Sequence, residues 1–205
     1  MTLSPGTSRG LVRLMQAGLV AVLAAGVALG NVSVIVNATL SLVVTALPAL
    51  LERDRGVTLD PVIVVWITVA VLLHSVGMVG LYDRVWWWDH LTHTLSGGLV
   101  AIAGYAVTSA VDEHAPDVSL PPAFLWVFVF LFTVAVGVCW ELLEMIGREL
   151  ARAMDVEPIL IVYSVEDTML DLVFNVVGAT VVAAMARLSG GRAVLERLGD
   201  SLARQ

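Results

Sequence analysis

Six long apolar segments take up most of this 205-residue chain, and they constrain its fold more than any other feature. Each comes close to the roughly 20 residues that a helix needs to cross the hydrocarbon core of a lipid bilayer. We therefore expect an all-α fold, a polytopic membrane bundle of about six transmembrane helices. The segments run over residues 11–29, 32–51, 61–81, 85–111, 121–146 and 168–188, and the fifth ends near residue 146 or one helical turn later.

The composition supports a membrane protein. Hydrophobic residues make up 59% of the chain and charged residues only 14%, which is too little polar surface for a soluble domain of this size. The length suits one compact bundle, and we expect the first apolar segment to be retained as its first helix. The sequence thus predicts a single transmembrane domain over residues 1–188 and a short polar C-terminal tail over residues 189–205.

The charged residues outside the apolar segments bear on partners and orientation. All 11 basic residues are arginine, against 18 acidic residues, and no basic stripe is present to bind a nucleic acid. With the N-terminus in the cytoplasm, eight arginines fall on the inner side and three on the outer side, as the positive-inside rule favours. The connection over residues 112–120 runs against this rule, because it is inner yet has no arginine. We expect a multi-pass protein of the cytoplasmic membrane with both termini cytoplasmic, and the oligomeric state stays open.

Acidic and histidine side chains occur within the last four apolar segments, at particular depths. They lie late in the third and fifth segments and early in the fourth and sixth. Because successive spans cross the bilayer in opposite directions, all these positions come to the same membrane face, whichever face is outside. The residues are His74, Asp89, His93, Glu141, Glu144, Asp167 and Asp171.

Spacing within each segment indicates that these side chains point inward together. Residues three or four apart share one face of a helix. Ionisable residues in a spanning helix are costly, usually face the bundle interior, and are functional candidates. The pairs with this spacing are Asp89 with His93, Glu141 with Glu144, and Asp167 with Asp171, and Asn175 repeats the last step.

A divalent metal ion is the most economical partner for such a group. Carboxylate oxygens and neutral imidazole suit Zn, Mn or Fe, and helical bundles build metal sites from similar Glu and His steps. A metal-bound water at the membrane face could attack an ester or phosphate bond of a lipid or envelope precursor. Glu141 or Glu144 would then be the general base. The predicted ligands are His74, Asp89, His93, Asp167 and Asp171.

Two other interpretations stay open. The same residues could form a structural hydrogen-bonded network, with Arg84, Arg148 or Arg152 as counter-charges. They could also form an ion or proton pathway of a transport protein. The run Trp86–Trp88 is expected to form an aromatic belt at the membrane interface.

Three stretches in order resemble the signatures of the YjdF-like family of prokaryotic inner-membrane proteins and, more distantly, the VanZ-like proteins. They read YDRVWWWDHLTHTLSGG, WELLEM and EDTMLDLVFNVVGA, and the resemblance covers roughly residues 61–184. In these families an Asp and a His four apart open one helix, a Glu closes a later one, and an Asp-rich start opens the last. The matching positions here are Asp89 and His93, then Glu141 and Glu144, then Asp167, Asp171 and Gly178, with His74 in LLHSVG matching an upstream histidine helix.

The resemblance has departures and limits. His90 stands where the family commonly has a basic residue, the triple Trp is unusual, and Asn175 is more typical of VanZ-like proteins. The YjdF-like family has no settled activity, and VanZ-like proteins are associated with glycopeptide resistance. The resemblance therefore supports a site and supplies no reaction.

Overall fold

The computed structural model describes residues 3–56, 58–115, 117, 120–156, 158–160 and 164–187. Throughout these residues the regular structure is helical, and six helices are long and apolar enough to cross a membrane. This confirms the predicted fold class. The predicted tail over residues 189–205 lies outside the described residues.

The helix bounds follow the predicted segments closely at most ends. The largest difference is in the first segment, whose helix begins at Pro5, before the predicted start at residue 11. The elements are α1 (Pro5–Leu29), α2 (Val32–Arg55), α3 (Pro61–Val76), the π-helical turn η1 (Gly77–Leu81), α4 (Tyr82–Arg84), α5 (Trp88–His114), α6 (Pro122–Ala153) and α7 (Val165–Arg187).

Local sequence explains where several of these helices begin and end. The Asp60 side chain accepts a hydrogen bond from the Val62 amide, and Pro61 occupies the first turn of α3, a start that the sequence predicts. Gly30 and Gly56 end α1 and α2 in the left-handed conformation, which costs glycine little.

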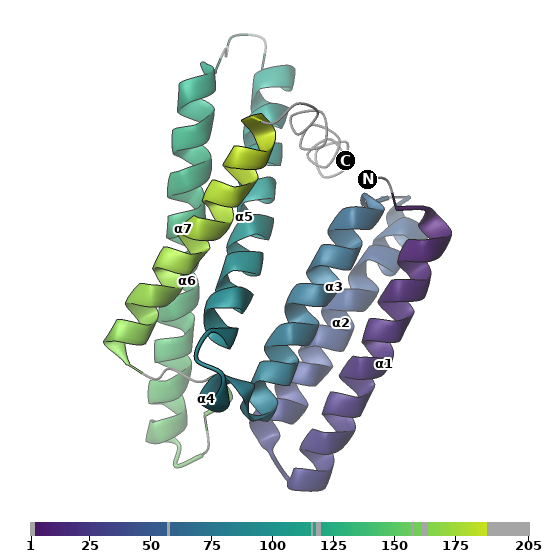
Figure 1. Cartoon of the computed structure of the whole chain (residues 1–205), viewed down its shortest axis with the longest axis vertical. Coiled ribbons are helices and arrows are strands. Elements are labelled where there is room, and N and C mark those ends of the chain that lie inside the picture. Colours follow the sequence, from purple (N-terminus) through teal and green to yellow (C-terminus); the bar gives the residue numbers. More distant parts are fainter. Residues whose placement is uncertain are drawn as a thin grey trace.

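The helices form two groups of three, α1–α3 and α5–α7, with α4 at one end between them (Figure 1). Contacts between α3 and α5 join the groups. Two indoles span this junction: Trp66 Nε1 donates to the Leu95 carbonyl at 3.1 Å, and Trp88 Nε1 donates to the Leu73 carbonyl at 3.0 Å. Trp88 therefore faces the bundle, whereas Trp86 is 79% exposed.

The outer faces of the helices are apolar. Large side chains such as Leu14, Leu29 and Leu131 are well exposed, and so much exposed apolar surface is unsuited to water. A lipid bilayer is the environment that fits these faces. The buried core lies among α3, α5, α6 and α7 and consists of Ile63, Ala101, Ile102, Tyr105, Val129, Ala179 and Val182.

Two glycines bring α5 and α7 into close contact. A Cβ atom at Gly97 would overlap the backbone of Asn175, and one at Gly178 would overlap the Thr94 carbonyl. Small residues allow helix backbones to approach closely in membranes. This contact sets the position of the first turns of α7 against the first turns of α5.

The third predicted segment does not continue as an unbroken α-helix to Leu81. It changes at Gly77 into the π-helical turn η1, within which Gly80 has φ 121°, a conformation that favours glycine. The ring of Tyr82 lies against Gly77, where an added Cβ would come within 2.5 Å of Tyr82 Cε2. Two glycines thus fold Tyr82 back along the end of α3.

Candidate metal centre

A cavity of about 370 Å³ lies among α3, α5, α6 and α7. Ile67, Val71, Leu99 and Val136 contribute to its apolar walls. The described lining contains no arginine. The polar and ionisable residues that line it include His74, Asp89, His93, Glu144, Asp167, Asp171 and Asn175.

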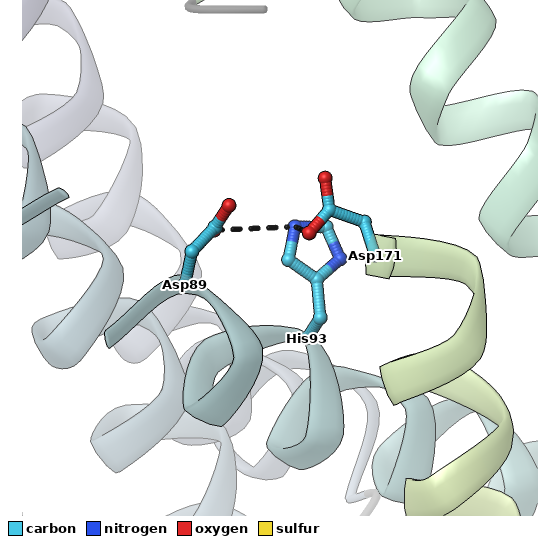
Figure 2. A group of neighbouring side chains, drawn as sticks. All are labelled: Asp89, His93 and Asp171. Carbon is cyan, nitrogen blue, oxygen red and sulfur yellow. Dashed lines mark ion pairs between the residues drawn. The ribbon is translucent and has the colours of Figure 1, made fainter. Parts of the chain in front are cut away.

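Three of the predicted ligands come together in this cavity. Asp89 and His93 lie one turn apart on α5, and Asp171 reaches them from α7. Each offers one ligand atom, and these atoms all lie within 4.8 Å of one another. Figure 2 shows the His93 imidazole between the two carboxylates.

The His93 ring presents a single nitrogen to both acids. Its Nε2 atom lies 3.4 Å from Asp89 Oδ1 and 3.6 Å from Asp171 Oδ1. Both distances exceed the 2.7–3.2 Å of an ordinary N–H···O hydrogen bond, and one N–H group cannot point at two oxygens. Asp171 is 3% exposed, and its buried Oδ1 has no hydrogen-bond partner within the described chain.

These distances fit ligands that share a cation. Ligand atoms about 2.1 Å from a tetrahedral Zn²⁺ lie about 3.4 Å from one another. Two carboxylates and an imidazole also suit Mn and Fe. The arrangement can therefore supply three ligands to one ion.

His74 lies in the cavity wall but has other partners. Its Nε2 atom is 3.3 Å from Asn37 Oδ1, and its Nδ1 atom is 2.8 Å from the Tyr82 hydroxyl. Both ring nitrogens are thus engaged, and His74 is not part of the three-residue group. The structure differs here from the predicted ligand set because η1 folds Tyr82 back onto α3.

The remaining predicted residues are placed around the three-residue group. Asp167 and Glu144 line the same cavity, and Glu144 is buried. Among the described residues, the group whose ligand atoms lie within 4.8 Å of one another is Asp89, His93 and Asp171, and neither Asp167 nor Glu144 belongs to it. Glu141 is also buried, with Oε1 lacking a hydrogen-bond partner among described residues, but it is not among the cavity-lining side chains.

Two of the arginines proposed as counter-charges lie near Glu149. Arg152 pairs with Glu149 at 2.8 Å, and Arg148 lies 3.6 Å from the same carboxylate. His90 stacks on Phe174 of α7 with ring centroids 4.2 Å apart and is outside the three-residue group.

Sequence reasoning missed three polar residues near the group, Asn37, Tyr82 and Thr92. Asn37 lies on α2, a segment that shows no acidic or histidine motif. Thr92 and Tyr82 flank Asp89 in sequence, but only the turn at η1 directs Tyr82 into the cavity. The paired glycines before Tyr82 were the available signal for such a turn.

Comparison with known proteins places this architecture in a family. Residues 11–192 match the family described as "Predicted membrane protein (DUF2238)". The chain belongs to this family. The match covers most of α1 and all of the other five spanning helices, so the cavity falls within the family region.

A match to a curated protein gives no information about activity. The chain is 27% identical over 116 residues to a Thermotoga maritima protein named "Uncharacterized protein". The alignment covers 56% of each chain, so it spans little more than half the length of that relative. No solved structure gives a significant match.

Proposed function

We propose that this membrane protein binds a divalent metal ion, Zn, Mn or Fe, through Asp89, His93 and Asp171. The observation that carries the proposal is the convergence of three ligand atoms within 4.8 Å in one cavity. Asp171 Oδ1 supports it, because this buried atom has no hydrogen-bond partner among the described residues and a cation would satisfy it.

The chemistry that fits such a centre is hydrolysis or group transfer. A bound metal lowers the pKa of its water and polarises an ester or phosphate. Glu144 lies in the cavity wall and is the better placed of the two predicted general bases, since Glu141 is not in the lining. Apolar walls beside the acidic group favour a lipid or an envelope precursor as substrate.

We also propose the cytoplasmic membrane as the location, with both termini in the cytoplasm. The arginine distribution supports this orientation. It puts the cavity at the outer face, where an envelope precursor is accessible. The resemblance to YjdF-like and VanZ-like proteins agrees with that location and is part of the proposal.

A non-enzymatic role is the second candidate. Polar contacts link His74, Tyr82 and Thr92 toward Asp89, and such a chain could belong to a structural network or to a proton pathway. A structural network would need no metal ion for stability, which separates it from the first candidate.

Metal analysis of the purified protein tests the proposal. We expect about one equivalent of metal in the wild type and a loss of binding in His93→Ala and Asp171→Ala. His90→Ala is the control for the first variant, because His90 is on the same helix and outside the group. Asp54→Ala, at an exposed acid, is the control for the second.

The metal-free protein is then titrated with Zn²⁺, Mn²⁺ and Fe²⁺ under reducing conditions. Binding of one ion at the group should raise the melting temperature of the wild type and of both controls. A wild type that binds none of the three ions after this titration would remove the metal proposal and leave the non-enzymatic candidate.

A further inference from the structure

The first turn of α5 carries Asp89, yet it follows a helix break and needs support from other elements. Residues 85–87 separate α4 from α5, so α5 does not inherit its position from the helix before it. Trp88 Nε1 bonds the Leu73 carbonyl at 3.0 Å. The second connection from this turn to α3 runs through Thr92 and Tyr82.

Thr92 lies at the centre of this second connection. Its Oγ1 atom donates to the Asp89 carbonyl at 2.8 Å and is 3.5 Å from Asp89 Oδ1. The Tyr82 hydroxyl is 3.4 Å from the same Oγ1 atom and 2.8 Å from His74 Nδ1. Polar contacts of 2.8–3.5 Å therefore lead from Asp89 to the end of α3.

The hydrogen bonds of Asn37, which contacts His74, determine which atoms donate and which accept in this series of contacts. Asn37 Nδ2 donates to the carbonyls of Ser33 at 2.9 Å and Ile159 at 3.0 Å. Because both partners only accept, the amide orientation is set and Asn37 Oδ1 faces His74. The neutral His74 ring then carries its proton on Nε2, and its Nδ1 accepts from the Tyr82 hydroxyl. The single hydroxyl hydrogens of Tyr82 and Thr92 are thus used at His74 and at the Asp89 carbonyl, so the 3.4 Å approach of the two hydroxyls is a packing contact.

Packing holds the Tyr82 ring in place, in addition to the contact between its hydroxyl and His74. The ring lies against Gly77, where any Cβ atom would collide with it. It also meets the His74 ring edge-on, with centroids 5.8 Å apart. Tyr82 is therefore fixed by shape at one end and by a directed hydrogen bond at the other.

We infer that Tyr82 and His74 are positioning residues that hold the Asp89 carboxylate where it can bind the same metal ion as His93 and Asp171. This rests on the proposed metal function. His74 thus acts from outside the ligand set, in neutral form, through Tyr82 and Thr92. Partners that orient ligands in this way affect metal affinity by about 10–100-fold in other proteins.

Tyr82→Phe tests the inference with the least disturbance, since it removes one oxygen and keeps the ring. We expect the affinity for the bound metal, measured by competition with a chelator, to fall about tenfold with the stoichiometry unchanged. Gly77→Ala should give the same loss by displacing the ring without removing a polar group. The double variant should be no weaker than the weaker single variant, because both act on one path.

Matched controls separate positioning from general damage. Tyr105→Phe makes the same chemical change in the apolar core, and Gly10→Ala adds a methyl group to open space on α1. Neither should change the affinity. A merely structural role would lower the melting temperature of the metal-free variants and leave the metal affinity of the folded protein unaltered, and that result overturns the inference.

Hydrogen exchange in the metal-free protein provides a readout that does not need the ion. We expect faster amide exchange over residues 88–96 in Tyr82→Phe than in the wild type or in Tyr105→Phe. Faster exchange in a protein that binds no metal would remove the proposed function and leave the positioning contact standing. Unchanged exchange together with unchanged affinity would overturn the positioning role.

Discussion

At the scale of single residues, the candidate site has more negative charge than its described contacts balance. Asp89 and Asp171 share one histidine nitrogen, at 3.4 and 3.6 Å. Glu141 and Glu144 are buried nearby on α6. A buried carboxylate without a full set of partners is costly, so each acid should respond differently to removal of its charge according to its role.

Glu141→Gln distinguishes these roles, because it keeps the shape of the side chain and removes the charge. Glu141 Oε1 has no hydrogen-bond partner among the described residues. We expect a melting temperature in detergent equal to or above that of the wild type. A loss on the order of 3–5 kcal/mol would instead show that Glu141 is a paired member of a structural network.

At the scale of helices, the site depends on how closely α5 and α7 approach. The ligands come from two helices that are far apart in sequence, and Gly97 and Gly178 let their backbones meet near His93 and Asp171. The glycine contact lies about one to two turns from these ligands. The position of Asp171 relative to His93 therefore depends on how α5 packs against α7.

Gly178→Ala should damage both the packing and the site. Its Cβ would overlap the Thr94 carbonyl, so α5 and α7 must separate. We expect a loss of stability of about 1–3 kcal/mol, typical of overpacking, together with weaker metal binding. Thermal unfolding and metal analysis of the same sample measure the two effects.

Gly18→Ala is the control for this substitution. Its Cβ would make an ordinary contact at 3.4 Å with the end of the Leu72 side chain. It should change neither stability nor metal content appreciably. Normal metal binding in a stable Gly178→Ala protein would contradict the dependence of the site on this helix contact.

At the scale of the whole molecule, the cavity lies toward one end of a bundle with exposed apolar faces. The cavity-lining acids and histidines come from the late part of α3 and α6 and the early part of α5 and α7. The polar group therefore occurs near one membrane face. Under the proposed function, the compartment that this group faces decides whether a substrate arrives from the cytoplasm or from the envelope.

Cysteine labelling determines this orientation. In a Cys139→Ser background, Arg84→Cys lies at the end of the bundle that bears the site, and Asp54→Cys lies at the opposite end. We expect an impermeant thiol reagent to label position 84 in intact cells and position 54 only after permeabilisation. The reverse pattern would place the cavity at the cytoplasmic face and contradict the arginine-based orientation.

The spans and the depth of the ionisable residues could be predicted from sequence alone. Long apolar runs fix which segments cross a bilayer, and Asp60 with Pro61 marks the start of α3. Alternating direction then brings the ends of α3 and α6 to the level of the starts of α5 and α7. These features depend on local composition and chain order, so they need no knowledge of side-chain contacts.

Only the tertiary structure decided which of these residues meet. Asp89, His93 and Asp171 converge because α5 and α7 pack through glycines. His74 instead bonds Tyr82 and Asn37. Spacing along one helix predicts its inward face, but the rotation and separation of neighbouring helices come from packing between distant parts of the chain. A turn such as η1 redirects a side chain for the same reason, because its conformation is set by what it packs against.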